Sequence, residues 1–142
     1  MTNIRIAVAE DAPAIYDLLC LMHQENGIFS ISHEKVKSKI TEVLNYGVVI
    51  VAVKDDQVVG TLGLSPNQVW YTDDWNLSDV WVFVHPDHRR STFARDLLRA
   101  AKEVAARLNM PIMVGVVSKK ETEGKVRLFS RHFQPIGQFF IG

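Results

Sequence analysis

The sequence has a single cysteine, no long hydrophobic run and no excess of charge of either sign. The lone Cys20 cannot form an intramolecular disulfide, which fits a reducing compartment. No apolar run approaches the roughly 20 residues that a membrane helix needs. Residues 1–11 also lack the apolar segment of a signal peptide. These absences predict a cytoplasmic protein that does not contact a membrane.

Charge is balanced, because 16 lysines and arginines face 16 aspartates and glutamates. Without a strong net field the chain has no global attraction for nucleic acid, so we expect no nucleic-acid partner. The 142 residues are 47% hydrophobic and 23% charged, as in ordinary globular proteins. No repeat, low-complexity tract or linker divides them. The sequence therefore predicts one domain over residues 1–142.

The first third of the chain reads as a strand followed by two helices. Residues 4–8 alternate in polarity as a half-buried strand does. Asp11 can cap a helix whose first turn admits Pro13. Ser32 can cap a second helix, which Gly47 ends near the position where a C-terminal glycine is expected.

From residue 48 onward, the spacing of the apolar residues changes from a helical pattern to one that is typical of strands. Residues 48–53 and 58–64 are apolar runs on either side of an Asp-Asp pair, which predicts a hairpin. The pair is neither Asn-Gly nor Asp-Gly, so the turn type is left open. Residues 65–76 read as a polar and aromatic loop, and residues 79–84 as a strand.

The second half carries the strongest helix signal of the sequence, at residues 91–108, where apolar side chains recur on one face. Residues 112–117 read as a buried strand. Residues 118–121 match a capping box and predict a last helix from Ser118. Residues 136–141 read as a final strand. The order β-α-α-β-β-β-α-β-α-β predicts an α+β fold with a mixed sheet of about six strands, in which residues 79–84 and 112–117 run parallel.

A buried strand runs into a basic loop at residues 82–92, and the loop opens the long helix. The first turn of a helix presents unpaired N–H groups and partial positive charge, so the junction can bind an anion. This segment resembles the cofactor motif of the GNAT acetyltransferases, whose strand leads into Val-x-Pro-x-x-Arg and then Arg/Gln-x-x-Gly-x-Gly/Ala. The matching positions are Val84, Pro86, Arg89 and Ala94. Thr92 departs from the pattern because the family has a glycine there.

The resemblance covers nearly the whole chain and implies the GNAT fold, with helices on both faces of the sheet, and acetyl-CoA as cosubstrate. It implies that the N–H groups of residues 90–95 bind the pyrophosphate of coenzyme A. Thr122 stands where the family often has an asparagine near pantetheine, and Phe129 stands where it has a tyrosine. The residues implied to bind the cofactor are Phe83, Val84, Arg89, Arg90, Ser91, Thr92, Phe93, Ala94, Arg95, Thr122 and Phe129.

The implied activity is transfer of an acetyl group from acetyl-CoA to a primary amine by direct attack in a ternary complex. An alkyl ammonium has a pKa of about 10.4, so a base or a desolvating site must supply the neutral amine. Asp79 is the first choice for this base because it lies on the strand that leads to the cofactor loop. Asp73, Asp74 and His85 are alternatives. A backbone N–H near Phe83 or Val84 can stabilise the oxyanion, as in the family.

The departing thiolate lacks an evident acid, because the family's tyrosine is replaced by Phe129. His132 on the last helix could approach the thiol instead. The alternative hypothesis is therefore a degenerate GNAT protein that binds coenzyme A or a protein partner without catalysis. A plain nucleotide-phosphate binder is disfavoured, because neither GxxxxGK[ST] nor GxGxxG is present.

The acceptor is left open between a small amine, an antibiotic, a peptide terminus and a lysine. Three aromatic residues lie in the loop before the cofactor strand, a region that helps to form the acceptor site in the family: Trp70, Tyr71 and Trp75. We expect them to contact the acceptor. No metal site is expected, and a homodimer is compatible with the sequence.

Overall fold

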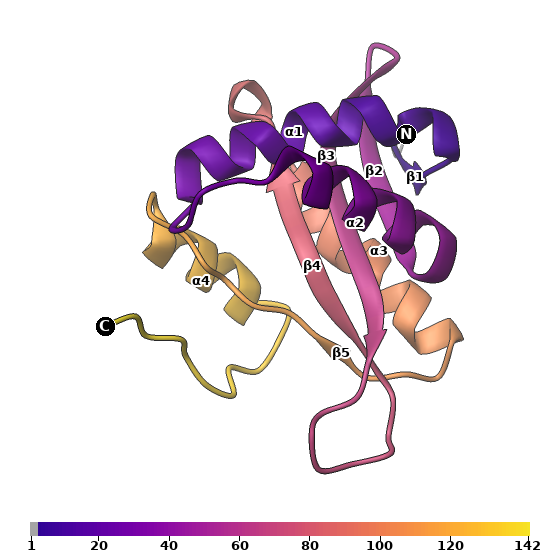
Figure 1. Cartoon of the computed structure of the whole chain (residues 1–142), viewed down its shortest axis with the longest axis vertical. Helices are drawn as coiled ribbons and strands as arrows, with labels where there is room; N and C mark the ends of the chain where they lie inside the picture. Colours follow the sequence, from indigo (N-terminus) through magenta and orange to yellow (C-terminus); the bar gives the residue numbers. More distant parts are fainter. Residues whose placement is uncertain (1–2) are drawn as a thin grey trace.

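The computed structural model describes residues 3–142, and its five strands form one sheet in which spatial order follows chain order (Figure 1). All neighbours pair antiparallel except the last two, which are parallel. The α+β prediction with a mixed sheet is confirmed. The strands are β1 (Ile4–Ile6), β2 (Val48–Lys54), β3 (Gln57–Asn67), β4 (Asn76–Val84) and β5 (Ile112–Met113).

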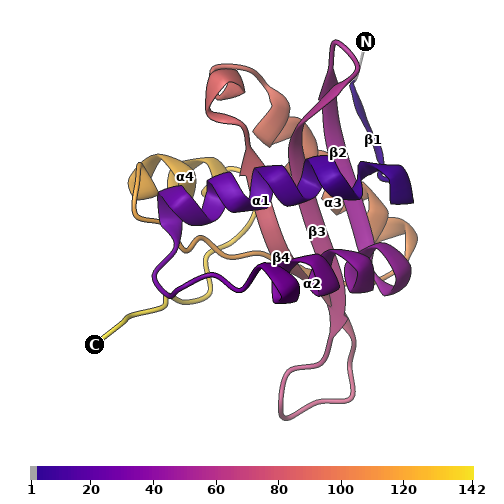
Figure 2. The same cartoon turned by 45° about the horizontal axis from the view of Figure 1, so that its top comes forward.

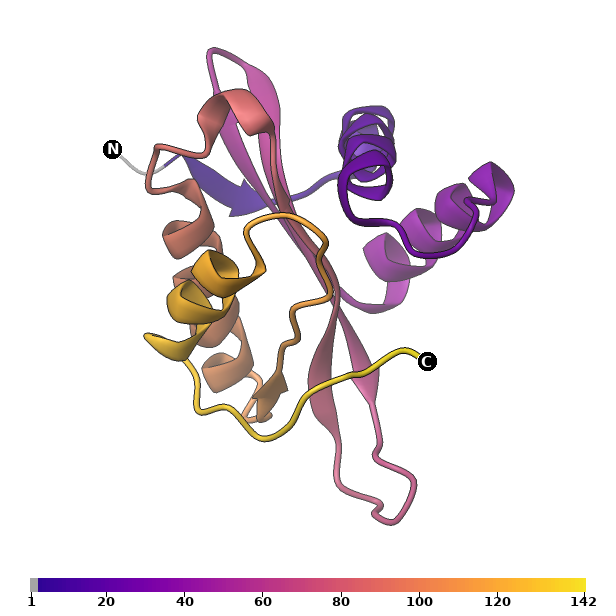
Figure 3. The same cartoon turned by 90° about the vertical axis from the view of Figure 1, so that its left-hand side faces the viewer.

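Helices cover both faces of the sheet (Figure 3). The helices α1 (Ala12–Asn26) and α2 (His33–Tyr46) pack on one face. The helices α3 (Phe93–Arg107) and α4 (Thr122–Ser130) lie on the other. Two short 3-10 helices, η1 (Ala9–Asp11) and η2 (Pro86–His88), precede α1 and α3. No helix within residues 3–142 is long and apolar enough to cross a membrane.

Each face of the sheet has its own hydrophobic cluster. On the α3 face the side chains of Leu97, Leu98 and Ala101 are fully buried, which confirms the apolar stripe read from the sequence. On the other face Ile15 and Val43 pack against β2 and Trp81. Burial of apolar surface stabilises by about 25 cal/mol per Å². The sheet is thus held from both sides, and β4 contributes to both clusters.

Of the three helix caps predicted from the sequence, one is present in the structure and two are not. The Ser32 hydroxyl accepts a hydrogen bond from the Lys35 N–H at 3.3 Å, as expected for the α2 cap. Asp11 does not cap α1; its carboxylate accepts from the Val8 N–H at 2.8 Å and pairs with Arg5. The η1 turn therefore occupies the place where direct entry into the helix was expected.

The capping box predicted at Ser118 is wrong. Helix α4 begins at Thr122, after Glu121 in a left-handed conformation with φ 52°. The Ser118 hydroxyl instead lies 2.8 Å from the Lys120 carbonyl and 3.1 Å from Asn26 Oδ1, two acceptors for its proton, and it accepts from Lys125 Nζ at 2.8 Å. The hydroxyl that the capping box would have used is thus engaged by the Lys120 carbonyl and by two tertiary partners, Asn26 and Lys125.

The β2–β3 hairpin is confirmed, and its turn is now defined. Asp55 and Asp56 both have positive φ, 52° and 63°. A two-residue loop with positive φ at both positions is a type I′ turn, which matches the twist of the strands. The following loop is shorter than expected, because β3 continues to Asn67 and pairs there with Asn76.

The sixth strand predicted at residues 136–141 is wrong, since these residues have no regular secondary structure. Phe139 and Phe140 are 87% and 89% exposed. A strand needs a partner for its backbone groups, and an apolar pattern alone does not supply one. The described sheet therefore has five strands.

Candidate active-site cleft

The strands β4 and β5 separate soon after they meet. They pair only at Leu77 with Ile112 and at Ser78 with Met113. The strand predicted over residues 112–117 is thus only two residues long. One extra residue, Val80, interrupts the β3–β4 register at this point. Such a bulge bends its strand and increases the local twist, which fits the divergence of β4 from residues 114–118.

A cleft of about 770 Å³ occupies the space between β4 and residues 115–118. The C-terminal end of α1 and one face of α4 complete its walls. In Figure 3 the segment after β5 arches away from the sheet before α4 begins. The cleft brings together six of the residues singled out in the sequence, namely Asp79, Phe83, Val84, Arg89, Ala94 and Phe129.

The open edge of β4 presents backbone groups to this cleft. The His85 N–H donates to the Val59 carbonyl at 2.8 Å, so His85 faces β3, as do Phe83 and Trp81 between the bulge and His85. Val82 and Val84 therefore direct their N–H and C=O groups to the opposite edge. The Val84 carbonyl accepts a hydrogen bond there from Arg89 Nε at 3.3 Å. The N–H groups of Val82 and Val84 can donate to a ligand in the cleft.

Asp79 lies where the two strands part. Burial raises the pKa of its carboxyl to about 6, against the opposing effect of the Gly115 N–H and its own N–H. The Gly115 N–H donates to the carboxylate at 3.3 Å. A carboxyl with a pKa of about 6 is mostly ionised at neutral pH and is more basic than an ordinary aspartate. It has the proton affinity expected of a general base.

The N-terminus of α3 has free donors in its first turn. The N–H groups of Ala94 and Arg95 have no hydrogen-bond acceptor among residues 3–142. The Phe93 N–H is already bonded to the Ser91 hydroxyl at 3.2 Å, and the Phe93 ring is buried. Ala94 is half-buried and lines the cleft, so an anion can approach its backbone closely.

Thr92 is the N-terminal residue that precedes α3, and its hydroxyl is occupied. It donates to the Asp96 carboxylate at 2.8 Å, which also pairs with Arg95 at 3.2 Å. Both the Thr92 hydroxyl and the Arg95 guanidinium therefore already have a partner inside the protein, the Asp96 carboxylate. Arg90, Ser91 and Thr92 are exposed and do not line the cleft.

Arg89 is held inside the protein by an ion pair that the sequence did not indicate. Its Nη2 lies 2.7 Å from Glu25 Oε2 on α1, and its guanidinium stacks 5.3 Å from the Phe83 ring. Burial raises the pKa of Glu25, but Arg89, Lys125 and Lys120 outweigh it and hold the pKa below its usual value. Arg89 thus anchors the loop between β4 and α3 to the end of α1.

Lys125 completes this polar cluster from α4. Its Nζ lies 3.6 Å from Glu25 Oε1 and 2.8 Å from the Ser118 hydroxyl. Burial lowers the pKa of Lys125, and Glu25 partly opposes the shift. Sequence reasoning missed Glu25 and Lys125, because they are far apart in the chain and belong to no local motif. Both Lys125 and Ser118 line the cleft.

Phe129 and Thr122 occupy different places on α4. The Phe129 ring lines the cleft and packs against the α3-face cluster, 6.4 Å from the Phe133 ring. Thr122 is exposed, donates to the Ser118 carbonyl at 3.1 Å and does not line the cleft. Of the two, only Phe129 can touch a molecule bound in the cleft as it stands.

The alternative acids and bases lie outside the cleft. His85 Nδ1 accepts from the Asp87 N–H at 3.1 Å and anchors the turn after β4. Asp73 and Asp74 are exposed in the β3–β4 loop. Burial and neighbouring cations, Arg99 first, lower the pKa of His132, which does not line the cleft. Within residues 3–142 no group of three His, Cys, Asp or Glu side chains can hold a metal ion.

The three loop aromatics are not brought to the cleft. Trp70, Tyr71 and Trp75 are 94%, 68% and 54% exposed, and none of them lines it. Figure 2 shows the β3–β4 loop projecting beyond the end of the sheet. The two strands stay paired as far as Asn67 and Asn76, which carries the loop away from the point where β4 and β5 part.

The chain was compared with protein families and with solved structures. Residues 12–133 match the acetyltransferase (GNAT) family. The fold resembles the aminoglycoside antibiotic 6'-N-acetyltransferase AAC(6')-IG from Acinetobacter haemolyticus, with a TM-score of 0.75 and 19% identity over 99% of this chain and 96% of that one. No curated protein matches the chain in sequence.

Two further structures share the fold. AAC(6')-Iy in complex with the bisubstrate analog CoA-S-monomethyl-acetylneamine is 14% identical, with a TM-score of 0.78 over 100% of this chain and 97% of that one. The ribosomal-protein-alanine N-acetyltransferase from Brucella melitensis biovar Abortus 2308 is 16% identical, with a TM-score of 0.73 over 100% and 99%. At these low identities, the TM-scores show a common fold.

Proposed function

We propose that this chain, which belongs to the GNAT acetyltransferase family, transfers the acetyl group of acetyl-CoA to a primary amine by direct attack in a ternary complex. One observation supports the proposal above the others. A single cleft joins the free N–H groups of the α3 N-terminus to the open edge of β4 and the half-buried carboxyl of Asp79, whose pKa is raised.

Acetyl-CoA supplies the thioester carbon that the amine attacks and the thiol that leaves. Backbone N–H groups of this chain fit both the pyrophosphate and the remainder of this cosubstrate. The Ala94 and Arg95 N–H groups can hold the pyrophosphate, because a helix N-terminus favours negative charge. The Val82 and Val84 N–H groups can hold the rest along β4, as an added strand would be held.

Asp79 takes the proton that the amine nitrogen loses as it bonds to the carbonyl carbon. The transfer is direct or passes through one water, since a general base must lie within hydrogen-bond reach. The N–H of Val82 or Val84 donates to the carbonyl oxygen while negative charge develops on it. The carbon–sulfur bond then breaks, and its electron pair leaves with the sulfur.

The departing sulfur needs a proton that Phe129 cannot supply. The cleft lining includes Lys125 Nζ and the Ser118 hydroxyl, two groups with exchangeable protons that are hydrogen-bonded to each other at 2.8 Å. Lys125 lies one helical turn before Phe129, so both side chains emerge on one face of α4. We assign the protonation of the thiolate to this Lys125–Ser118 pair.

The binding half of the proposal is tested by thermal unfolding with acetyl-CoA. Saturation at about 100 Kd should stabilise the folded state by roughly 2.7 kcal/mol. Ala94→Glu should abolish the shift, because a carboxylate in the amide cradle repels the pyrophosphate. The matched control is Ala106→Glu, the same change at an exposed site near the other end of α3. No shift in the wild-type protein would refute cofactor binding.

A second candidate, a protein that binds coenzyme A without catalysis, is favoured by Phe129 and Thr92, which both depart from the family's motifs. Phe129→Tyr separates the two. If the ring points at the sulfur, the added hydroxyl should raise turnover by up to the 10²–10⁴-fold typical of a placed acid. If the ring is only core, an unpaired buried hydroxyl should cost roughly 1–3 kcal/mol of stability. A thiol-release assay and a melting curve on the same variant distinguish these results.

A further inference from the structure

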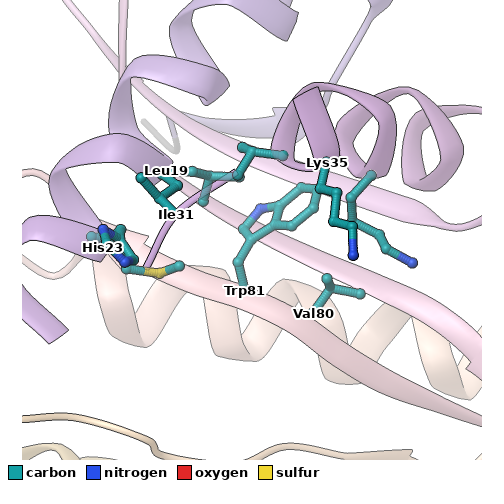
Figure 4. Close-up of a pocket in the computed structure, with 9 residues that line it drawn as sticks. Leu19, His23, Ile31, Lys35, Val80 and Trp81 are labelled. Atoms are coloured by element: carbon teal, nitrogen blue, oxygen red, sulfur yellow. The ribbon is translucent and has the colours of Figure 1, made fainter. Parts of the chain in front are cut away.

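A second pocket, of about 330 Å³, lies on the α1–α2 side of β4 (Figure 4). Its walls come from α1, from the segment that joins α1 to α2, from α2 itself and from β4. The indole of Trp81 stands in the middle of the close-up, between Leu19 and Ile31 on one side and Lys35 on the other. The bulge residue Val80 closes the pocket from below in this view.

This pocket adjoins the cleft already described. Met22, His23, Val80 and Trp81 line both cavities. Val80 follows Asp79 directly, so a molecule in the second pocket can present one end to the cleft beside the candidate base. On the proposed function, which this step assumes, the second pocket is where the acceptor amine lies.

The floor of the pocket offers hydrocarbon contacts and little hydrogen bonding. Trp81 is only 4% exposed, and its Nε1 donates to the Thr61 hydroxyl at 3.0 Å, so its polar atom is already used. His23 Nε2 is likewise bonded to the Phe29 carbonyl at 2.6 Å. An acceptor therefore meets the ring face of Trp81 together with Leu19 and Val80, which suits an apolar body.

The charges around the pocket are positive. Lys35 and Lys39 line it, and no carboxylate does. Lys39 pairs with Glu42 in an exposed contact, whereas Lys35 has no ion pair within residues 3–142. Cationic neighbours repel a polycation, attract an anion and lower the pKa of a nearby ammonium, which favours the reactive neutral amine.

We propose that the acceptor is a primary amine on an apolar body that carries a carboxylate at its far end, held by Lys35. The carboxylate faces α2, the apolar body lies on Trp81, and the amine reaches the cleft beside Asp79. A polycationic acceptor such as an aminoglycoside is disfavoured by the same charges. The neighbours of similar fold named for aminoglycosides share only the architecture with this chain.

The test uses three amines that differ only in the charge opposite the amine. These are 4-(aminomethyl)benzoate, benzylamine and 4-(aminomethyl)benzylamine, with the polycation kanamycin as a fourth. Thiol release is measured at saturating acetyl-CoA. We expect kcat/KM to be highest for the carboxylate-bearing amine, lower for the neutral amine and lowest for the dication. The highest value should exceed the lowest by about tenfold or more, as the gain or loss of a charge contact allows.

The variant Lys35→Glu should abolish or reverse this order while acetyl-CoA affinity stays unchanged. Lys37→Glu is the matched control, because it makes the same change on α2 at a residue that does not line the pocket. The control should keep the wild-type order. An unchanged order in Lys35→Glu would overturn the assignment of the carboxylate to this lysine.

Other outcomes separate this inference from the function on which it rests. Equal rates for the three amines, or the highest rate with the dication or kanamycin, would overturn the acceptor class and leave acetyl transfer established. Release with none of the four, while acetyl-CoA still binds, would overturn the acceptor class, whereas failure of acetyl-CoA to bind would overturn the proposed function.

Discussion

The strand β4 pairs with β3 at eight positions, from Gly60–Val84 to Asn67–Asn76, and with β5 at only two. Along the β3 edge, the backbone N–H and C=O groups of β4 are hydrogen-bonded in the ladder. The side chains of this paired region pack into the hydrophobic clusters. On the β5 edge the ladder stops at Ser78, and a cleft with free N–H groups and the half-buried carboxyl of Asp79 takes its place. One strand thus provides stability along one edge and reactive groups along the other.

The open edge is not left unsupported. Side-chain contacts replace the missing ladder: Asp79 with the Gly115 N–H, and Glu25 with Arg89 and Lys125. These contacts hold α1, α4 and the loop before α3 around the cleft. We therefore expect substitutions on the two edges to have different effects, which four experiments can measure.

The largest expected effect is on turnover. Asp79→Asn removes the proposed base, and we expect kcat to fall by about 10²–10⁴-fold. In the wild-type protein kcat/KM should rise with pH through about 6 as Asp79 ionises, and this limb should be absent in the variant. Acetyl-CoA affinity, measured by calorimetry, should not change. A wild-type pH profile in the variant would give the role of base to water or to another residue.

The next effect is on stability at the mouth of the cleft. Arg89→Ala leaves the Glu25 carboxylate, whose side chain is 10% exposed, with Lys125 as its remaining ion-pair partner. Removal of one partner of a buried ion pair costs about 3 kcal/mol, at the lower end of the usual range because Lys125 remains. Denaturant unfolding of Arg89→Ala, Glu25→Gln and the double variant, compared with the wild type, gives the free energies of a double-mutant cycle. Additive losses would mean that the pair is not coupled.

Asp79 should also make stability depend on pH. Its pKa is raised from 3.8 to about 6 on folding, so the stabilisation present below pH 3.8 is lost as pH rises through about 6. About two pKa units correspond to roughly 3 kcal/mol at most. Asp79→Asn should lack this loss and be more stable than the wild type at pH 8. The exposed carboxyl of Asp87 provides the control variant Asp87→Asn, which should keep the wild-type profile.

The smallest effect concerns the paired edge. The Thr61 hydroxyl is fully buried, accepts from Trp81 Nε1 at 3.0 Å and donates to the Ile50 carbonyl at 3.2 Å. Thr61→Val leaves the indole N–H unpaired, which should cost about 1–3 kcal/mol. Thr61→Ser keeps the hydroxyl and should lose less. Weaker acetyl-CoA binding in Thr61→Val would show that the two edges of β4 are not independent.

Sequence reasoning succeeded where the signal is local. The apolar stripe of α3, the Ser32 cap and the two apolar runs of the β2–β3 hairpin each depend on residues a few positions apart. The strand-to-helix junction was found for the same reason, and the structure places it at one end of the cleft. Periodicity and caps are properties of a short segment, so they can be read without the rest of the chain.

The failures concern features that need a distant partner. The segments 114–117 and 136–141 have strand-like composition, yet neither is a strand, because no neighbour pairs with them. Ser118 matches a capping box but bonds to Asn26 instead. Trp70 and its neighbours were expected at the acceptor site and lie beyond the end of the sheet, because strand length was set by pairing.

The sequence by itself determined the α+β class, the order of all but the last element and the junction at residues 82–95, because these depend on local periodicity and on one contiguous motif. Only the tertiary structure decided that β4 and β5 part after Ser78 and that Asp79 is half-buried at that point. It also joined Glu25 to Arg89 across 64 residues. Burial, pairing and ion contacts between distant segments arise only when the chain is folded, and the candidate chemistry depends on all three.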